Sequence, residues 1–229
     1  MANVSVLSLG GSIISPDSVD TAFLTNFVKA IKEYLDSDKN NKLIIVTGGK
    51  APARNYQNAY KTIIPNAESA MLDWIGIAAT HLNGILVKSL FNEYCDDELV
   101  INPNAPISFK NQVLVAGGWK PGFSTDTDAV ILAKRFKATK LINLSNIAKV
   151  YTADPKLDPN AQPIDNISWE DFRLMVGDDW VPGRNVPFDP IASKEAEAMK
   201  LTVICADGRN IENMMAILKN QEFVGTTIS

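Results

Sequence analysis

Residues 4–11 read VSVLSLGG, a short apolar run that ends in two glycines. The arrangement returns twice, because residues 43–49 read LIIVTGG and residues 113–118 read VLVAGG. Apolar runs of this length are typical of strands that are buried on both faces. Between these runs, apolar residues recur at the spacing of an amphipathic helix. The first such helix follows Asp20, which is a candidate N-cap. Alternating strands and helices predict an α/β fold whose mainly parallel sheet is covered on both faces.

The alternation continues along the rest of the chain, without an internal repeat. The predicted strands are 4–9, 43–46, 113–116, one from 141, 202–205 and an edge strand at 226–228. The predicted helices begin near residues 20, 50, 69, 126, 168, 192 and 211, with Asp126 as the cap of its helix. A boundary between two lobes of one continuous sheet falls near Lys110.

Composition narrows the functional classes. The chain has 229 residues and a formal net charge of −4, a balance that disfavours nucleic acid as a partner. No apolar run approaches the roughly 20 residues that span a bilayer, so we expect no membrane partner. Residues 1–3 lead straight into a strand without a basic segment, which is not typical of a signal peptide. These features favour a cytoplasmic protein.

Cysteine and histidine exclude further classes of site. Cys95 and Cys205 belong to no C-x-x-C pattern and are expected to be reduced, half-buried thiols. His81 is the single histidine, so a histidine-rich zinc site is excluded. A catalytic triad would have to be built on His81, and no nucleophile elbow accompanies it. We therefore expect His81 on the surface of a helix.

The loops after the strands are the candidate ligand site, since ligands of open parallel sheets bind beyond the carboxyl ends of the strands. Three of these loops hold a Gly-Gly pair, where backbone N–H groups can approach an anion. The pattern predicts a ligand with more than one phosphate. No G-x-G-x-x-G follows the first strand, and Phe123 stands where a P-loop after Gly117 would need lysine.

A series of motifs along the whole chain resembles the amino acid kinase superfamily, and within it the archaeal type of uridylate (UMP) kinases. The series is Leu9-Gly10-Gly11-Ser12, Thr47-Gly48-Gly49, Ala53-Arg54, Asp73-x-x-Gly76, Gly117-Gly118-x-x-Pro121-Gly122-x-Ser124-Thr125-Asp126, Asn146, Val150-Tyr151-Thr152-Ala153-Asp154-Pro155-Lys156, Asp189-Pro190-x-Ala192-x-Lys194 and Gly225-Thr226-Thr227-Ile228. The V-Y-T-A-D-P-K and P-G-x-S-T-D stretches are its most specific parts.

The resemblance implies a three-layer αβα sandwich, the amino acid kinase fold, in a single domain over residues 1–229. A lobe of about residues 1–110 is then the acceptor side, and a lobe of about 111–229 is the ATP side. The implied activity is ATP-dependent phosphorylation of UMP to UDP in pyrimidine nucleotide biosynthesis. Mg²⁺ is the implied cofactor, and the implied assembly is a homo-oligomer, a hexamer.

The resemblance also assigns residues to ATP and to UMP. The residues implied to hold ATP are Gly10, Gly11, Ser12, Gly49, Arg54, Ser145, Asn146, Tyr151 and Asp154. The residues implied to hold UMP are Gly48, Asp73, Gly118, Trp119, Lys120, Pro121, Gly122, Phe123, Ser124 and Thr125. The alternative for Asp73 is a carboxylate facing solvent from a helix, and the alternative for Trp119 is a core residue.

The implied catalytic residues are Asp189, Lys50 and Arg54. Lys50 replaces the third glycine that the family usually has in the second loop, while Ser12 stands where many relatives have a lysine. We hypothesise that Lys50 supplies the missing positive charge to the transferring phosphoryl group. Arg54 offers a planar fork suited to phosphate, or is simply a surface arginine. Asp189 polarises a lysine or organises the metal, or is a turn residue before Pro190.

No direct metal ligand is assigned, because Mg²⁺ arrives with ATP. Asp126 either organises this ion or caps its helix. The Asp-Gly that borders the family's adenine site is Ala148-Lys149 here. Residues 176–186 form a solvated loop, a lid or a subunit contact, from which Arg184 is a candidate to reach a phosphate, and Asp178-Asp179 is interpreted as a solvated acid pair.

Two other functions remain open at this point. The first is a sibling kinase of the same fold with another acceptor, such as a carbamate, an amino acid or an isoprenyl phosphate. The second is a relative that binds nucleotides or oxyanions without catalysis. Acceptor specificity separates the first from UMP kinase, and ATP binding without phosphoryl transfer identifies the second.

Overall fold

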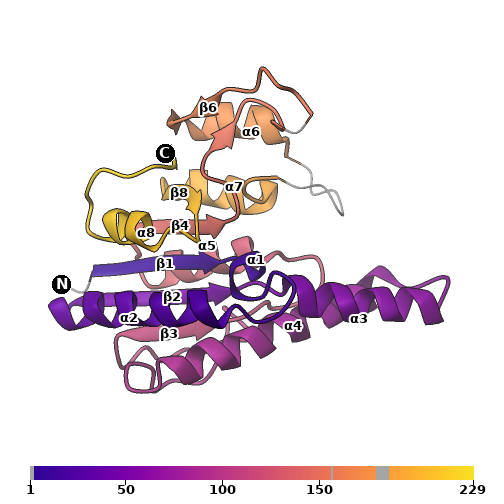
Figure 1. Cartoon of the computed structure of the whole chain (residues 1–229), viewed down its shortest axis with the longest axis horizontal. Helices are drawn as coiled ribbons and strands as arrows, with labels where there is room; N and C mark the ends of the chain where they lie inside the picture. The colour runs from indigo at the N-terminus through magenta and orange to yellow at the C-terminus, as the bar shows by residue number, and fades with distance from the viewer. Residues whose placement is uncertain (1–2, 156, 179–185) are drawn as a thin grey trace.

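A mixed sheet in the order β3-β2-β1-β4-β8-β9-β7 forms the centre of the computed structural model, which describes residues 3–155, 157–178 and 186–229 (Figure 1). Its strands are β1 (Asn3–Leu9), β2 (Asn41–Thr47), β3 (Val113–Ala116), β4 (Lys140–Ser145), β7 (Asn166–Ile167), β8 (Thr202–Asp207) and β9 (Thr226–Ile228). Strands β3, β2, β1, β4 and β8 are parallel. A separate antiparallel pair joins β5 (Val150–Tyr151) and β6 (Pro163–Ile164).

Helices cover both faces of this sheet, so the predicted three-layer αβα sandwich is confirmed. The helices are α1 (Gly11–Ile14), α2 (Thr21–Ser37), α3 (Lys50–Ile63), α4 (Ser69–Leu90), α5 (Thr125–Arg135), α6 (Trp169–Val176), α7 (Pro190–Ala198) and α8 (Ile211–Leu218). Helices α2, α4 and α8 share one apolar core with the sheet, and α5, α6 and α7 share the other.

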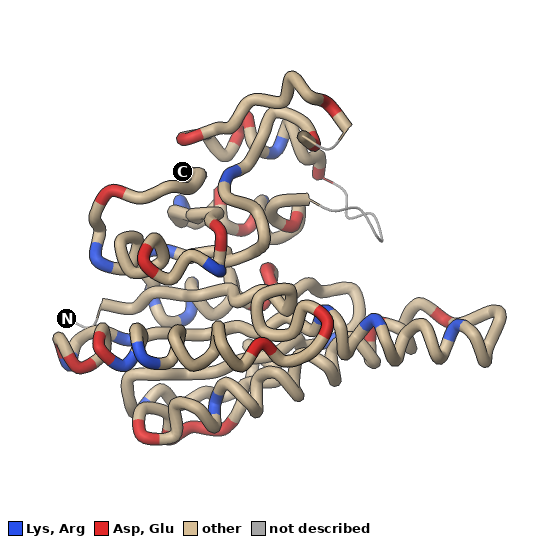
Figure 2. The backbone as a smooth tube through the Cα atoms, viewed as in Figure 1, with Lys and Arg blue, Asp and Glu red and all other residues tan. Residues whose placement is uncertain are grey.

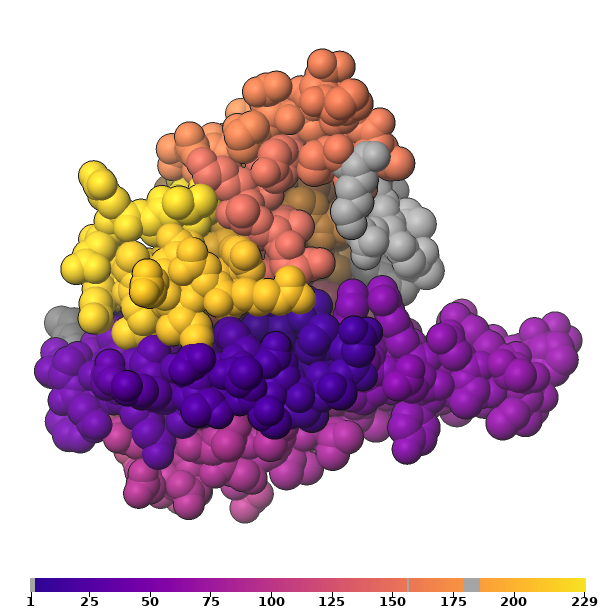
Figure 3. All heavy atoms as spheres, viewed as in Figure 1, coloured from indigo at the N-terminus to yellow at the C-terminus, as the bar shows by residue number. Residues whose placement is uncertain are grey.

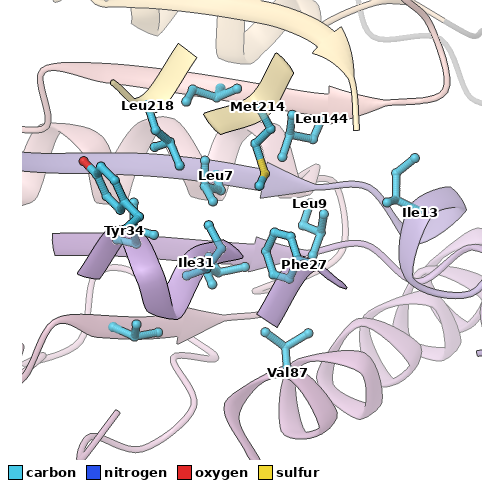
Figure 4. Close-up of a cluster of buried hydrophobic side chains, with 14 of the residues drawn as sticks. Leu7, Leu9, Ile13, Phe27, Ile31, Tyr34, Val87, Leu144, Met214 and Leu218 are labelled. Carbon is cyan, nitrogen blue, oxygen red and sulfur yellow. The ribbon is translucent and has the colours of Figure 1, made fainter. Parts of the chain in front are cut away.

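The core under α2 and α8 shows why these elements stay together (Figure 4). Leu7 and Leu9 point from β1 to this face, as the period of two in a strand requires. Phe27 and Ile31 meet them from one side of α2, and Met214 meets them from α8. All five side chains are fully or almost fully buried, so the strand and both helices bury one continuous apolar face.

Local signals in the sequence account for most element boundaries, with two corrections. Asp20 caps α2 as predicted, since its Oδ1 accepts from the N–H of Phe23 at 2.9 Å. Asp126 does not cap α5, because Ser124 does so through the N–H of Thr127 at 3.2 Å. The strand at 226–228 exists but is not an edge strand, since β9 lies between β8 and β7. It is antiparallel to β8.

Helices α3 and α4 form a hairpin, called the arm, that extends past the arrowheads of β1 and β2 (Figure 1). The sphere view shows the far end of the arm standing clear of the sandwich (Figure 3). Helix α4 is 22 residues long with a mean hydropathy of 1.3 over its most apolar stretch, which suffices by length and composition to cross a membrane. Asp73, His81 and Lys88 interrupt its apolar residues, so the helix contains no uninterrupted apolar run of that length.

The contacts of α4 place it in the sandwich. It packs against α3, β2 and β3, and its polar residues Thr80 and Asn83 are buried there.

In the view of Figure 2, acidic and basic residues are interspersed along the trace of the chain.

Candidate active site

Five strands end at the same edge of the sheet, and their loops form the candidate site. The segments after β1, β2, β3, β4 and β8 begin at Gly10, Gly48, Gly117, Asn146 and Gly208. The predicted gathering of these segments follows from the parallel order of the strands, since parallel strands end on one side. Hydrogen bonds join neighbouring loops: the N–H of Gly10 donates to Leu144 O at 2.9 Å, and the N–H of Gly208 donates to Ser145 O at 2.8 Å.

The glycines of the first two loops lie against each other. A Cβ on Gly48 would stand 2.4 Å from the Gly11 nitrogen, and a Cβ on Gly11 would stand 2.8 Å from the Gly48 carbonyl carbon. Contacts this short do not occur for real side chains, so both positions require glycine. The sequence pattern predicted glycines that admit a ligand, and the structure adds a second reason, which is the contact between the two loops themselves.

Helix α4 holds the second loop and the end of β2 in place through hydrogen bonds of buried polar groups. The amide of Asn83 donates to Gly48 O at 2.7 Å. The hydroxyl of Thr47 lies 2.9 Å from Thr80 O and 3.1 Å from Ala116 O, and so joins the end of β2 to α4 and β3. Thr47 is fully buried and Asn83 is almost so, which makes these hydrogen bonds strong determinants of the loop positions.

Lys50 follows the second loop and has an unusual backbone. Its φ is +36°, in the left-handed region that favours glycine. The family's third glycine at this place fits that conformation, and the lysine adopts it at a cost of roughly 1–2 kcal/mol. Partial burial lowers the pKa of Lys50, and the positive charge of Arg54 lowers it further. Arg54 lies one turn along α3 and is exposed.

The loop of residues 117–124 lies on α4. Both backbone polar groups of Gly118 contact α4. Its N–H donates to Thr80 Oγ1 at 2.7 Å, and its carbonyl oxygen lies 2.7 Å from His81 Nε2. Further along, the N–H of Gly122 donates to Asp73 Oδ2 at 3.2 Å. Asp73 is partly exposed and faces the loop as well as solvent.

The middle of this loop carries a stack of aromatic and cationic side chains. The rings of Trp119 and Phe123 have centroids 4.9 Å apart. Lys120 Nζ lies 4.0 Å from the Trp119 centroid and 4.7 Å from that of Phe123, within the range of cation–π attraction. Trp119 is only partly buried, so it is not a core residue. Pro121 and Thr125 complete the predicted set, with Thr125 as the first residue of α5.

Two carboxylates, those of Asp126 and Asp189, lie side by side where α5 and α7 begin. Asp126 accepts from the Ser8 hydroxyl at 3.2 Å and from the N–H of Asp189 at 3.3 Å. Burial raises the pKa of Asp126 to about 6, and the nearby charge of Asp189 contributes. Asp189 caps α7, since its Oδ1 accepts from the N–H of Ala192 at 2.9 Å. Its position before Pro190 thus serves the helix start, as the alternative interpretation held, and also places its carboxylate beside Asp126.

Asp128, a further carboxylate of α5, was not predicted as a site residue. It is fully buried in the first turn of α5, and its Oδ2 accepts from the N–H of Trp119 at 3.0 Å. Its Oδ1 has no hydrogen-bond partner among the described residues. Burial raises the pKa of Asp128 to about 7; the Trp119 N–H opposes this shift, and the charge of Asp126 adds to it.

The residues expected around the adenosine lie at two places. Ser145 ends β4 and Asn146 follows it, whereas Tyr151 belongs to the β5–β6 pair and Asp154 is an exposed residue after that strand. Arg209, which sequence reasoning missed, donates through Nη2 to Ser12 O at 3.4 Å. This contact places a guanidinium beside the first glycine loop, where a phosphate is expected.

Some predictions concerning single residues have a clear outcome. His81 is not a plain surface residue, because its ring contacts Gly118 O. Cys95 and Cys205 are free and buried, and burial raises the pKa of Cys205 to about 12. Lys156, Asp179 and Arg184 lie outside the described residues. A cavity of about 430 Å³ lies away from the candidate site, lined by residues of the 96–110 loop.

The acidic side chains near the site can be compared with what a Mg²⁺ ion requires. Among the described residues, no three His, Cys, Asp or Glu side chains gather into a metal site. Asp126 and Asp189 form a pair of carboxylates whose mutual repulsion a divalent cation would relieve. Mg²⁺ commonly binds through one or two carboxylates together with substrate phosphates and water, so this pair fits an ion that arrives with a nucleotide.

The amino-acid sequence is similar to those of several uridylate kinases over nearly its full length. The chain is 35% identical to the uridylate kinase of Archaeoglobus fulgidus over 226 residues, which cover 98% of this chain and 99% of that protein. It is 34% identical to the uridylate kinase of Thermoplasma volcanium over 232 residues, covering 97% and 96% of the two chains.

Solved structures give the same result. The crystal structure of the uridylate kinase from Archaeoglobus fulgidus superposes with a TM-score of 0.82 at 33% identity, covering 98% of this chain and 99% of that one. The UMP kinase from Bacillus anthracis superposes with a TM-score of 0.78 at 20% identity over 99% and 96% of the two chains, a likeness of fold. Residues 3–207 match the amino acid kinase family. The chain belongs to the amino acid kinase family.

Proposed function

We propose that the chain is a UMP kinase, which transfers the γ-phosphoryl group of ATP to UMP and forms UDP and ADP. The observation that carries the proposal is the contact between Asp73 on α4 and Gly122 in the loop of residues 117–124. It brings together the two segments that the family resemblance assigns to the acceptor. The similarity to uridylate kinases over nearly the full chain supports the same acceptor.

In this reaction a phosphate oxygen of UMP attacks the γ-phosphorus of ATP, and the bond between that phosphorus and the β–γ bridging oxygen breaks. Such a transfer needs positioning and charge stabilisation more than a nucleophile on the protein. We assign the backbone of Gly10, Gly11 and Ser12 to the ATP phosphates. Arg209 adds a cation beside them through its contact with Ser12.

Lys50 and Arg54 are the cations that we assign to the transferring group. Gly48 and Gly49 lie between the first loop and α4, so in this proposal they separate the two nucleotides. We assign Asp73 to the acceptor ribose and residues 118–125 to the base and phosphate of UMP. Ser145, Asn146, Tyr151 and Asp154 are assigned to the adenosine, and Asp189 to the metal.

Asp126 and Asp189 are the residues that would hold Mg²⁺ brought by ATP. The ion would supply positive charge that neutralises the phosphate oxygens. The Ser8 hydroxyl and the N–H of Asp189 fix the orientation of the Asp126 carboxylate for this task.

The two lobes expected from the sequence are part of the proposal. Residues 1–110 form the acceptor side, and residues 111–229 form the ATP side. The loop of residues 117–124 follows the boundary in the chain but lies against α4 of the first lobe, because β3 pairs with β2. The acceptor site is therefore built from both parts of the chain.

We also propose a cytoplasmic homo-oligomer, a hexamer by resemblance, that serves pyrimidine nucleotide synthesis. The exposed apolar side chains of the arm support a second copy of the chain as the partner. Trp74, Leu82 and Ile85 of α4 are 47%, 60% and 55% exposed. Their spacing places them on one side of the helix, and exposed apolar side chains gathered in this way favour an interaction surface.

The test is ADP formation from ATP and Mg²⁺ with UMP, CMP, dUMP and AMP offered separately. The proposal predicts strong turnover with UMP. Turnover with a carbamate, an amino acid or an isoprenyl phosphate instead would identify a sibling kinase. Folded protein that binds ATP but transfers phosphoryl to no acceptor would identify a binding protein and overturn the proposal.

A further inference from the structure

Two side chains outside the family motifs hold the loop of residues 117–124 from opposite sides. His81 contacts the loop from α4, and Asp128 contacts it from α5. Their partners are adjacent in the chain, because His81 bonds the carbonyl of Gly118 and Asp128 bonds the N–H of Trp119. These two groups belong to one and the same peptide unit, so both helices grip a single rigid plane.

We propose that His81 and Asp128 are positioning residues for the phosphoryl acceptor, which they serve by fixing the peptide plane between Gly118 and Trp119. The inference rests on the proposed function, since it takes this loop as the site of UMP. Neither side chain touches the nucleotide in the proposal. Each acts through the orientation of the loop.

The chemical groups determine which partner donates in each of the two hydrogen bonds. A carbonyl oxygen can only accept, so His81 Nε2 carries a proton and donates to Gly118 O. Asp128 Oδ2 accepts from the N–H of Trp119. Rotation of the peptide plane would break both hydrogen bonds together, and the plane therefore has one favoured orientation.

The glycines of the loop pack closely against α4. A Cβ on Gly117 would stand 2.6 Å from His81 Cδ2, and one on Gly118 would stand 3.3 Å from Thr80 Oγ1. The imidazole thus fills the space beside Gly117 as well as holding Gly118. Trp119 leaves this fixed plane to meet Lys120 and Phe123 in their stack, so the plane sets where the stack begins.

The burial of Asp128 argues against a purely structural purpose. A fully buried carboxylate with one unpartnered oxygen is costly to keep, and an apolar residue would suit its place in the α5 core better. The hydrogen bond that Asp128 makes with the loop is the one from the N–H of Trp119. Positions that lower stability in this way are commonly kept for function.

The test uses two matched pairs of variants in the full-length protein. His81→Gln keeps a donor near the position of Nε2, whereas His81→Leu removes it. Asp128→Asn keeps an acceptor of the same shape, whereas Asp128→Leu is similar in size and removes it. The readouts are KM for UMP, KM for ATP, kcat, and the dissociation constant of UMP measured by calorimetry without ATP.

We expect His81→Leu and Asp128→Leu to raise KM and the dissociation constant for UMP at least about fivefold, with KM for ATP unchanged. His81→Gln and Asp128→Asn should stay within about twofold of the parent protein in both quantities. Gln112→Leu is the control for general destabilisation. Gln112 bonds Leu35 O, Asp38 O and Asn41 O at the opposite edge of the sheet, so its loss should lower stability without changing either KM.

The outcomes separate the inference from the function on which it rests. Parent protein that binds UMP, with Leu variants that bind it equally well, would overturn the inference alone. The inference also fails if Gln112→Leu weakens UMP binding as much, or if KM for ATP rises in parallel. Parent protein that neither binds nor phosphorylates UMP would overturn the proposed function, and the inference with it. If Asp128→Leu does not fold, the His81 pair decides.

Discussion

The backbone nitrogen of Lys50 lies 2.6 Å from the point that a Cβ on Gly11 would occupy. The obstacle is backbone, so it cannot rotate away as a side chain would. We expect Gly11→Ala to lower the free energy of unfolding by about 1–3 kcal/mol, as overpacking does, and to lower kcat/KM for both nucleotides. Urea denaturation and steady-state kinetics measure the two effects.

The matched control for this substitution is Gly76→Ala in α4. A Cβ there would meet only Gln57 Nε2, at 3.1 Å, and that atom is the end of a flexible side chain. Alanine is also the better helix former, by roughly 0.8–1 kcal/mol. Stability should therefore stay level or rise. A Gly11→Ala protein as stable and as active as the Gly76→Ala protein would refute the account of the loop contact.

Lys50 allows stability to be separated from activity. Lys50→Gly relieves the left-handed backbone and should raise the free energy of unfolding by about 1 kcal/mol, while the loss of charge lowers turnover. Lys50→Ala loses the charge but keeps the strain, so it should lower turnover without gaining stability. Both variants with full turnover and unchanged ATP dependence would remove Lys50 from the phosphoryl site.

The carboxyl of Asp128 should make stability depend on pH. Its pKa is about 7 in the folded protein, against 3.8 in the unfolded chain. Between these values the unfolded chain loses a proton that the folded protein keeps, so the free energy of unfolding falls as pH rises, by up to about 1.4 kcal/mol per unit. Asp128→Asn should remove this component of the slope. Urea denaturation at intervals from pH 4 to pH 8 tests it, and identical slopes in both proteins would contradict the assignment.

The exposed apolar face of α4 should hold the oligomer together. Leu82→Glu with Ile85→Glu places charges on this face and should yield a species of 25.0 kDa in sedimentation, where the parent protein is larger. Leu174→Glu is the control, because Leu174 is 80% exposed on α6, away from the arm. Parent-like assembly of the double variant would place the interface elsewhere.

The sequence predicted the parallel sheet, its helical layers and the edge where the loops meet, since apolar runs and glycine pairs are local signals. It also predicted β3 and the strand at 226–228 at their observed bounds. The place of β9 inside the sheet was missed, because the neighbours of a strand depend on the path of the whole chain. The cap of α5 was misplaced because Ser124 and Asp126 are both good capping residues, and only the backbone angles distinguish them.

The missed residues of the candidate site share a physical reason. His81 and Arg209 act through backbone groups of segments that are distant in the chain, and Asp128 acts through the backbone N–H of Trp119. A hydrogen bond to a carbonyl or an N–H leaves no trace in the partner's residue type, so no pair of letters in the sequence points to it. The unusual composition of α4, with one histidine in an apolar helix, was the only available signal.

The contact between Gly11 and Gly48 has a consequence for how the chain can vary. A clash between two side chains is commonly cured by shrinking the partner residue. Here each partner is already the smallest residue, so neither position can compensate for a change at the other. A selection for revertants of Gly48→Ala should thus return glycine at residue 48, or changes that move the backbone of β1 or β2, and no substitution at residue 11.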